Sequence, residues 1–207
     1  MEVTRKRKNR PTSRPGRPRA FDLDRALEAA LKVFWRLGYE GASLPDLTKA
    51  MGINRPSMYA AFGNKEELFR KVVGRYSAGA CEHVASALGR PTARKVAESL
   101  LRGTAEMLGD SKHPAGCLLV QGALACGADS NCVRNELAAR RAAGEAAIRK
   151  RFERAVREGD LPRGATAADL ARFITTMQHG MSVQATGGAT RKQLLQVADL
   201  AMRAWPR

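Results

Sequence analysis

The apolar residues of this chain recur at helical spacing from about residue 22 onward. Leu27, Leu31 and Phe34, for example, follow one another at intervals of four and three residues, which places them on one face of a helix. No segment shows the strict apolar–polar alternation of a β-strand, and glycines and prolines separate the helical segments. The sequence therefore predicts an all-α fold of about nine helices. These run from Asp22 or Asp24 to about Leu37, over about 44–51 and 55–61, from Lys65 past Tyr76, and near 92–109, 114–126, 131–159, 166–186 and 190–205.

Short polar side chains stand where the early helices are expected to begin. Ser43 precedes Asp46 by three residues, and Asn64 precedes Glu67 by the same interval, which is the spacing of a capping box. Asn54 is expected to cap the short helix between them. Each helix is expected to stop at a glycine, as these regions contain Gly38, Gly52 and Gly63.

The positive charge of the chain is concentrated at its N-terminus. The whole chain of 207 residues has a formal net charge of +16. Residues 1–20 contain eight Lys or Arg residues against Glu2 alone, and three prolines, so we expect a disordered basic arm. A charge block of this kind is typical of an arm that binds a polyanion such as nucleic acid, although a merely solubilising tail would look the same.

Composition also limits the possible classes of protein. The longest apolar runs are too short to span a bilayer, and no apolar segment of a secretory signal follows the basic start, so we expect a cytoplasmic protein. The four cysteines are expected to be reduced thiols. No Gly-rich phosphate loop, HExxH motif or nucleophile elbow is present, and the three histidines are scattered. We therefore expect neither an enzyme nor a bound cofactor.

Residues 44–61 have the layout of a helix-turn-helix. Two short helices flank the turn MGIN, which supplies the glycine that such turns often contain. The second helix of this motif enters the major groove of DNA with its N-terminal end, so the side chains there must be polar or slender. Arg55 can donate two hydrogen bonds to guanine or to a phosphate, Ser57 can reach a base edge or a phosphate, and Tyr59 can reach a phosphate. Pro56 fits the first turn, where it removes no helical hydrogen bond.

Two residues at neighbouring helix starts are further candidates for phosphate contacts. Ser43 and Lys65 each lie where exposed backbone N–H groups favour an anion. Both residues could instead serve only the helix starts themselves. We favour the phosphate role for Ser43 and Lys65, and a purely capping role for Asn54 and Asn64.

The run GYEGASLPDLTKAMGINRPSMYAAFGNKEELF, within residues 24–76, resembles the DNA-binding domain of the TetR family of bacterial repressors. The resemblance covers about fifty residues, which is far more specific than a helix-turn-helix match alone. It implies that Ser43, Arg55, Ser57, Tyr59 and Lys65 take the DNA-contact positions. Pro56 stands where the family often has glycine or threonine, so an apolar contact is expected there.

The basic arm gains a specific role beside such a domain. Its segment Arg14-Pro15-Gly16-Arg17-Pro18-Arg19 resembles an AT-hook, in which extended Gly-Arg-Pro lies in the narrow minor groove of A·T-rich DNA. Proline keeps the backbone extended, and arginine is attracted by the negative potential of that groove. We therefore expect Arg14, Arg17 and Arg19 to extend the DNA contact.

The resemblance also implies how the chain is divided into domains. After the basic arm over 1–20, it assigns residues 21–76 to DNA binding and 77–207 to dimerisation and the sensing of a small-molecule inducer. The helices near 166–186 and 190–205 are amphipathic, which suits a four-helix bundle made by two subunits, although packing within one chain has the same periodicity. We therefore expect the protein to be a homodimeric repressor that binds a palindromic double-stranded DNA operator and dissociates from it when an inducer binds.

The sequence identifies the inducer site only weakly. The helices that line the pocket in the family carry Gln121, Phe152, Met177, Gln178 and Met181, each of which could equally be a core residue. Cys117, in the segment HPAGC, lies near an expected helix start that would favour its thiolate. Some TetR-like proteins sense oxidants or electrophiles with a cysteine in a similar setting, so a Cys117-triggered repressor is an alternative, as is an inert buried thiol.

A metal site and an architectural role are two further possibilities that the sequence favours less. A metal site made of His113, Cys117, Cys126 and Cys132 is disfavoured because the spacing is not of the CxxC type. An architectural nucleic-acid-binding protein would explain the basic arm, but it would leave the large helical region without a role. A DNA footprint distinguishes a repressor from an architectural protein, because a repressor protects a short palindrome and an architectural protein coats DNA broadly.

Overall fold

A computed structural model describes residues 21–124, 127, 130–162 and 164–206. The described residues form nine α-helices and no strand, which confirms the all-α prediction. The helices are α1 (Leu23–Gly41), α2 (Leu44–Met51), α3 (Arg55–Phe62), α4 (Lys65–Leu88), α5 (Ala93–Leu108), α6 (Leu118–Gln121), α7 (Asn131–Arg157), α8 (Ala167–Thr186) and α9 (Arg191–Arg203). The basic arm, with Arg14, Arg17 and Arg19, lies outside the described residues.

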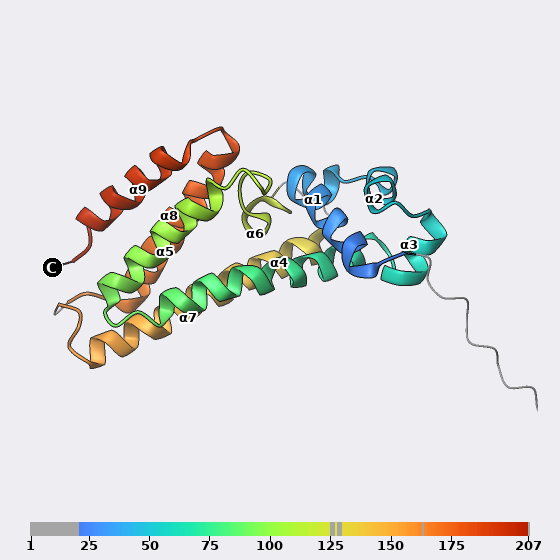
Figure 1. The fold of residues 1–207 in the computed structure, drawn as a ribbon. Helices are drawn as coiled ribbons and strands as arrows, with labels where there is room; N and C mark the ends of the chain where they lie inside the picture. The colour runs from blue at the N-terminus through green and yellow to red at the C-terminus, as the bar shows by residue number, and fades with distance from the viewer. Residues whose placement is uncertain (1–20, 125–126, 128–129, 163, 207) are drawn as a thin grey trace, which may run out of the picture.

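The molecule is elongated, with α1, α2 and α3 at one end and α5, α8 and α9 at the other (Figure 1). Helix α4 begins beside α3 and extends into the larger group of helices, where it packs on α5 and α7. Helix α7 packs mainly on α8, and α5 packs between α8 and α9. No described helix is both long and apolar enough to cross a membrane.

The buried apolar side chains form two clusters. One fills the space between α5, α7, α8 and α9, with Phe152 and Ile174 fully buried and Trp205 edge-on to Phe152 at a centroid distance of 5.4 Å. The other fills the space between α1, α2, α3 and α4 around Phe34 and Phe69. This second cluster also includes Leu118 of α6 and Val133 and Leu137 of α7. The core of the N-terminal end is therefore completed by residues that come much later in the chain.

The helix caps agree with the sequence prediction. The side chains of Ser43 and Asn64 each accept a hydrogen bond from the backbone N–H three residues later, and Asp46 and Glu67 close the two capping boxes. Asn54 Oδ1 accepts from the backbone N–H of Ser57 at 2.9 Å. Of the two aspartates proposed to start α1, Asp22 is the cap. These caps fix where the short helices α2 and α3 begin, although neither is long enough to be stable alone.

The helix expected over 114–126 is wrong in its extent, because α6 has only four residues, Leu118–Gln121. Gly116 has a φ of +85°, which interrupts any helix that would start at Pro114. The backbone N–H of Tyr39 donates to the carbonyl of Gly122 at 2.7 Å, so the residue that follows α6 is hydrogen-bonded to α1. The segment 114–122 is therefore shaped by contact with α1, which no local pattern reveals.

Candidate functional site

The N-terminal half of α3 presents its polar side chains to solvent. Met58 and Phe62 are buried and hold the helix on the core, with exposed fractions of 0% and 4%. Arg55 and Pro56 are exposed, and Tyr59 is 46% exposed on the same short helix. No hydrogen bond or ion pair to another described residue engages the Arg55 guanidinium, so it is available to an external partner.

Ser57 is half-buried, and its backbone N–H is used by the Asn54 cap. Its side chain forms no hydrogen bond with the part of the chain that the structure describes. Arg55, Pro56 and Ser57 occupy the first three positions of α3, so the Arg55 guanidinium and the Ser57 hydroxyl, which no described residue engages, share the N-terminal end of the helix. This end of α3 can therefore receive an anion or the edge of a base.

The other two predicted DNA-contact residues lie at the starts of neighbouring helices. Ser43 caps α2. Its hydroxyl and its backbone N–H both donate to the Asp46 carboxylate, and these two hydrogen bonds hold the pKa of Asp46 below its ordinary value. Lys65 opens α4 and places its ammonium 4.6 Å from the centroid of the Tyr39 ring. Both side chains are thus already engaged within the protein, and their contact with phosphate stays a prediction.

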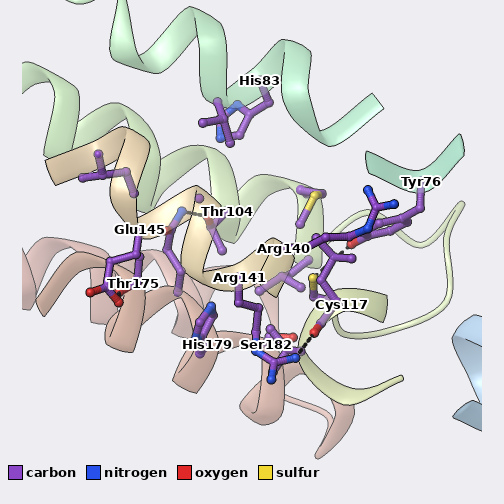
Figure 2. A pocket seen from close by; sticks show the side chains of 18 residues that line it. Tyr76, His83, Thr104, Cys117, Arg140, Arg141, Glu145, Thr175, His179 and Ser182 are labelled. Carbon is purple, nitrogen blue, oxygen red and sulfur yellow. Dashed lines mark hydrogen bonds between the residues drawn. The ribbon is translucent and has the colours of Figure 1, made fainter. Parts of the chain in front are cut away.

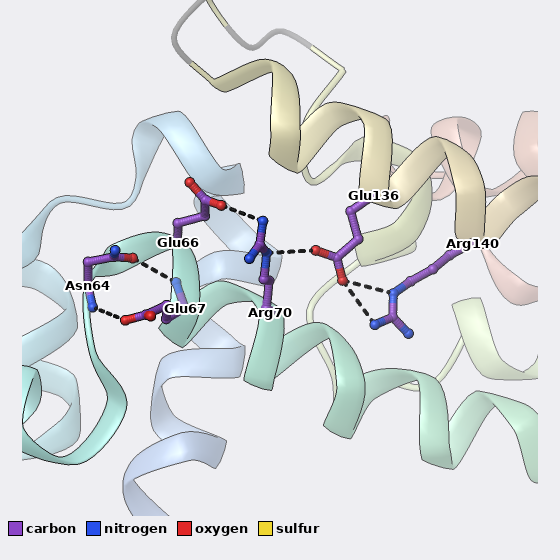
Figure 3. Close-up of polar contacts among 6 residues, drawn as sticks. All are labelled: Asn64, Glu66, Glu67, Arg70, Glu136 and Arg140. Atoms are coloured by element: carbon purple, nitrogen blue, oxygen red, sulfur yellow. Dashed lines mark hydrogen bonds and ion pairs between the residues drawn. The ribbon is translucent and has the colours of Figure 1, made fainter.

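Charged side chains connect the start of α4 with α7 (Figure 3). Arg70 lies 2.6 Å from Glu66 one turn earlier and 3.2 Å from Glu136 of α7. Glu136 also binds Arg140, at 3.0 Å. Exposed pairs of this kind contribute only about 0–1 kcal/mol each, so they position α7 against α4 more than they stabilise the fold.

The C-terminal end of α1 is joined to the segment around α6. The indole N–H of Trp35 donates to the carbonyl of Gly116 at 3.0 Å. Four residues further on, the backbone N–H of Tyr39 donates to the carbonyl of Gly122. The hydroxyl of Ser130, just before α7, donates to the Glu40 carboxylate. The helix-turn-helix region and the larger helical region are therefore connected at α1 as well as through α4.

A cavity of about 160 Å³ lies between α4, α5, α7, α8 and the segment that contains α6 (Figure 2). Its wall is mainly apolar, with Val84, Leu108, Leu119 and Ile148 among its lining residues. Polar side chains interrupt that wall, and those labelled in Figure 2 are Tyr76, His83, Thr104, Cys117, Arg140, Arg141, Glu145, Thr175, His179 and Ser182. An apolar wall with a few polar groups is the usual character of a small-molecule site.

Two of the six predicted ligand residues, Cys117 and Gln178, line this cavity. The Gln178 amide donates to the Thr104 hydroxyl at 2.8 Å. The other four lie elsewhere. Gln121 donates to the carbonyl of Ala115, Phe152 and Met181 are buried in the core, and Met177 packs against that core.

Cys117 is the N-cap residue of the single-turn helix α6, and its side chain makes no capping hydrogen bond. Its sulfur accepts a hydrogen bond of 3.2 Å from the Tyr76 hydroxyl. Burial, and then the neighbouring Cys117, raise the pKa of Tyr76, so the phenol stays protonated at neutral pH. Within the described part of the chain, no three His, Cys, Asp or Glu residues are grouped so as to hold a metal ion, and Cys126 of the disfavoured metal set lies outside that part.

Several cavity residues are absent from the predicted set, notably Tyr76, Arg141, His179 and Ser182. They come from α4, α7 and α8, and only the packing of those helices brings them together. Burial, and then the nearby charge of Arg141, lower the pKa of His179 below its ordinary value, against an opposing effect of Glu145. A polar residue on the inner face of an expected helix is the one signal in the sequence that could have identified Ser182.

Comparison with known proteins identifies the relatives of this chain. Residues 26–72 match the family of bacterial regulatory proteins named tetR. The chain is 36% identical over 196 residues to the HTH-type transcriptional repressor ComR of Escherichia coli strain K12, covering 92% of each chain. It is also 36% identical over 110 residues to the repressor BdcR of the same strain, covering 52% of this chain and 55% of BdcR.

The fold has a solved counterpart at high sequence identity. A cysteine mutant of the TetR family transcriptional regulator CifR, complexed with 26-bp double-strand operator DNA, is 44% identical. The match covers 92% of this chain and 100% of the CifR chain, with a TM-score of 0.88. With an N-terminal helix-turn-helix, a larger helical region and relatives that match along nearly the whole chain, this protein belongs to the TetR family and is a DNA-binding transcriptional regulator.

Proposed function

We propose that the protein is a repressor that binds a palindromic operator as a homodimer and leaves it when a small molecule occupies the cavity. The observation that carries this proposal is the pairing of two sites in one chain. The exposed, unengaged start of α3 can contact DNA, and the cavity lies where α4 and the α6 segment connect that end to the rest of the molecule. The repressor names of ComR and BdcR and the operator in the CifR complex support the same reading.

We assign the DNA contacts to Arg55, Pro56, Ser57 and Tyr59 of α3, to Ser43 and Lys65, and to the arm residues Arg14, Arg17 and Arg19. We further divide the chain into the arm (1–20), the DNA-binding domain (21–76) and the sensing and dimerisation domain (77–207). Helix α4 crosses the second boundary, so a change in its tilt moves one domain relative to the other. The regulator would act in the cytoplasm, where its DNA target lies, and we assign it no catalytic role.

The proposed dimer interface lies on α8 and α9. Three large apolar side chains of these helices face solvent in the single chain, namely Val183 at 51%, Val197 at 38% and Leu200 at 65% exposure. Two copies of such a helix pair form a four-helix bundle, and burying the apolar surface drives the association. The two recognition helices of the dimer would then lie about 34–36 Å apart, one turn of DNA.

The two connections between the domains explain how a bound ligand would release the protein from its operator DNA. A ligand in the cavity contacts α4 and the segment that contains Cys117, and these are the two elements that reach the DNA-binding end. If the ligand packs better when α4 is tilted, it shifts the equilibrium by its differential affinity, typically about 1–3 kcal/mol. By reciprocity, operator DNA weakens ligand binding by the same factor.

A matched pair of substitutions tests the dimer and the DNA binding together. Leu200→Asp places a charge in the proposed interface, whereas Val156→Asp places one at a comparably exposed site on α7, where Val156 is 46% exposed. We expect Leu200→Asp to be a folded monomer by light scattering that no longer binds operator, and Val156→Asp to remain a DNA-binding dimer. A dimeric Leu200→Asp protein with parental affinity would contradict the proposed interface.

Cys117 supports a second candidate function, a repressor triggered by an oxidant or an electrophile. The observation that favours it is the place of the thiol, which lies at the cavity wall 3.2 Å from the hydroxyl of Tyr76. A reactive molecule inside the cavity would meet that sulfur directly. Covalent modification would then have the same effect on α6 and α1 as a bound ligand.

A further inference from the structure

The size and the charges of the cavity restrict the ligand that it can hold. This inference rests on the proposed function, because it assumes that the cavity of about 160 Å³ is the sensing site. An apolar cavity of about 150 Å³ in another protein holds benzene, so a ligand of roughly six to ten non-hydrogen atoms fits here.

The charged side chains on the cavity wall are balanced, with one exception. Glu145 lies 2.7 Å from Arg172 and also accepts from the Thr175 hydroxyl. Arg140 is paired with Glu136 of its own helix. Arg141 has no carboxylate partner among the described residues and is half-buried. Its Nη1 donates to the carbonyl of Leu119 at 2.5 Å, which leaves Nε and Nη2 without a described acceptor.

A second polar group near this end of the cavity also lacks a partner. Ser182 is 1% exposed, and its hydroxyl has no hydrogen-bond partner among the described residues. His179, one turn before Ser182 on α8, lies on the same face of that helix. Figure 2 draws Arg141, His179 and Ser182 together, and Arg141 is close enough to His179 to contribute to its lowered pKa. His179 is therefore neutral at pH 7 and adds no positive charge, but its ring can still donate one hydrogen bond.

We propose that the cavity binds a small carboxylate with a compact apolar body, whose carboxylate is held by the guanidinium of Arg141 and the hydroxyl of Ser182. A half-buried guanidinium with no carboxylate partner among the described residues and a buried, unsatisfied hydroxyl are both unfavourable, and such a ligand satisfies both. A guanidinium and a carboxylate also match in geometry, since both are planar and can share two hydrogen bonds. The apolar body would then occupy the region lined by Val84, Leu108 and Ile148.

Three probes of nearly equal size distinguish the carboxylate from its neutral analogues. Benzoate, benzamide and benzyl alcohol are titrated into the full-length protein by calorimetry at pH 7. We expect benzoate to bind at least about tenfold more tightly than either neutral probe, since it alone completes the charge pair. Equal binding of benzamide or benzyl alcohol would overturn the inference, and so would the failure of benzoate to bind at all.

Matched variants locate the bound carboxylate. Arg141→Met should weaken benzoate binding by about tenfold or more and leave the neutral probes unaffected. Ser182→Ala removes a hydroxyl that no described residue uses, and it should weaken benzoate binding by about three- to tenfold without changing the fold. Arg149→Met is the control, because Arg149 lies on the same helix but pairs with Glu153 at the surface. Benzoate binding that survives both cavity substitutions would contradict the assigned site.

Operator binding by the same unliganded samples separates this inference from the proposed function. If the protein binds DNA but benzoate is not preferred, the carboxylate inference fails and the repressor proposal stands. If the unliganded protein binds no specific DNA, the repressor proposal itself fails, whatever the probes do.

Discussion

Replacing Arg55 by alanine isolates one contact of the recognition helix. Arg55 is the first residue of α3, is exposed, and has no hydrogen bond or ion pair with another described residue. Its removal therefore takes nothing from the folded monomer, and Asn54 still caps the helix. We expect the melting temperature of Arg55→Ala to equal that of the parent within about 1–2 °C, because surface substitutions of this kind change stability by at most about 0.5 kcal/mol.

The effect of Arg55→Ala should appear entirely as a loss of DNA-binding free energy. A bidentate arginine–guanine contact contributes about 1–3 kcal/mol of discrimination. A symmetric dimer makes the contact twice, so the loss is about 2–6 kcal/mol, or roughly 30-fold to more than 10,000-fold in affinity. The substitution should also relax the preference at one base pair in each half-site, because no other side chain would replace that readout.

Fluorescence anisotropy with labelled operator and with scrambled duplex, at several salt concentrations, measures both effects. Arg154→Ala is the charge-matched control, since Arg154 lies near the far end of α7 and, among the described residues, pairs only with Glu158 at the surface. We expect the control to bind operator like the parent. An Arg55→Ala protein that loses less than about twofold, or loses the same factor on scrambled DNA, would refute the assignment of Arg55 to base readout.

Three further changes test other parts of the account. Deleting residues 1–19 should leave a folded dimer, because both described apolar clusters lie beyond that segment, but it should lower operator affinity and reduce the slope of log affinity against log salt; an unchanged slope would show that the arm does not engage DNA. Phe152→Ala should destabilise the protein by about 3–5 kcal/mol and lower its melting temperature by roughly 6–20 °C, since Phe152 is fully buried against Trp205; a thermal scan that shows parental stability would contradict that packing. Cys117→Ser should keep its DNA bound in the presence of a mild oxidant or a thiol-reactive electrophile if Cys117 is the trigger, and a Ser variant that is released like the parent would leave the non-covalent site as the sensor.

The helices and their caps could be predicted from sequence because their causes are local. Ser43, Asn54 and Asn64 each bond a backbone group three residues away, and Gly52 and Gly63 follow the last residues of α2 and α3. The exposed, polar start of α3 could be predicted for the same reason, since it depends on a few consecutive residues, and its contact with DNA stays a prediction. Such features require no knowledge of how distant helices pack.

The cavity could not be predicted in the same way. Phe152 and Met181 have the same helical periodicity as true lining residues, yet they face the core. Arg141 and Ser182 line one cavity only because α7 packs on α8, and α6 is short because Tyr39 and Trp35 bind carbonyls about eighty residues away. These are long-range contacts, and apolar periodicity cannot say which element a helix face meets.

A footprint of the purified protein on the DNA upstream of its own gene tests the central claim most directly. The account predicts one short protected site with two-fold symmetry, whose half-sites are centred about one helical turn apart and which is occupied by two protomers. Adding a ligand of the cavity should remove the protection while light scattering still detects the dimer. Continuous protection along the fragment, or no protection at all, would contradict the account of an operator-binding repressor.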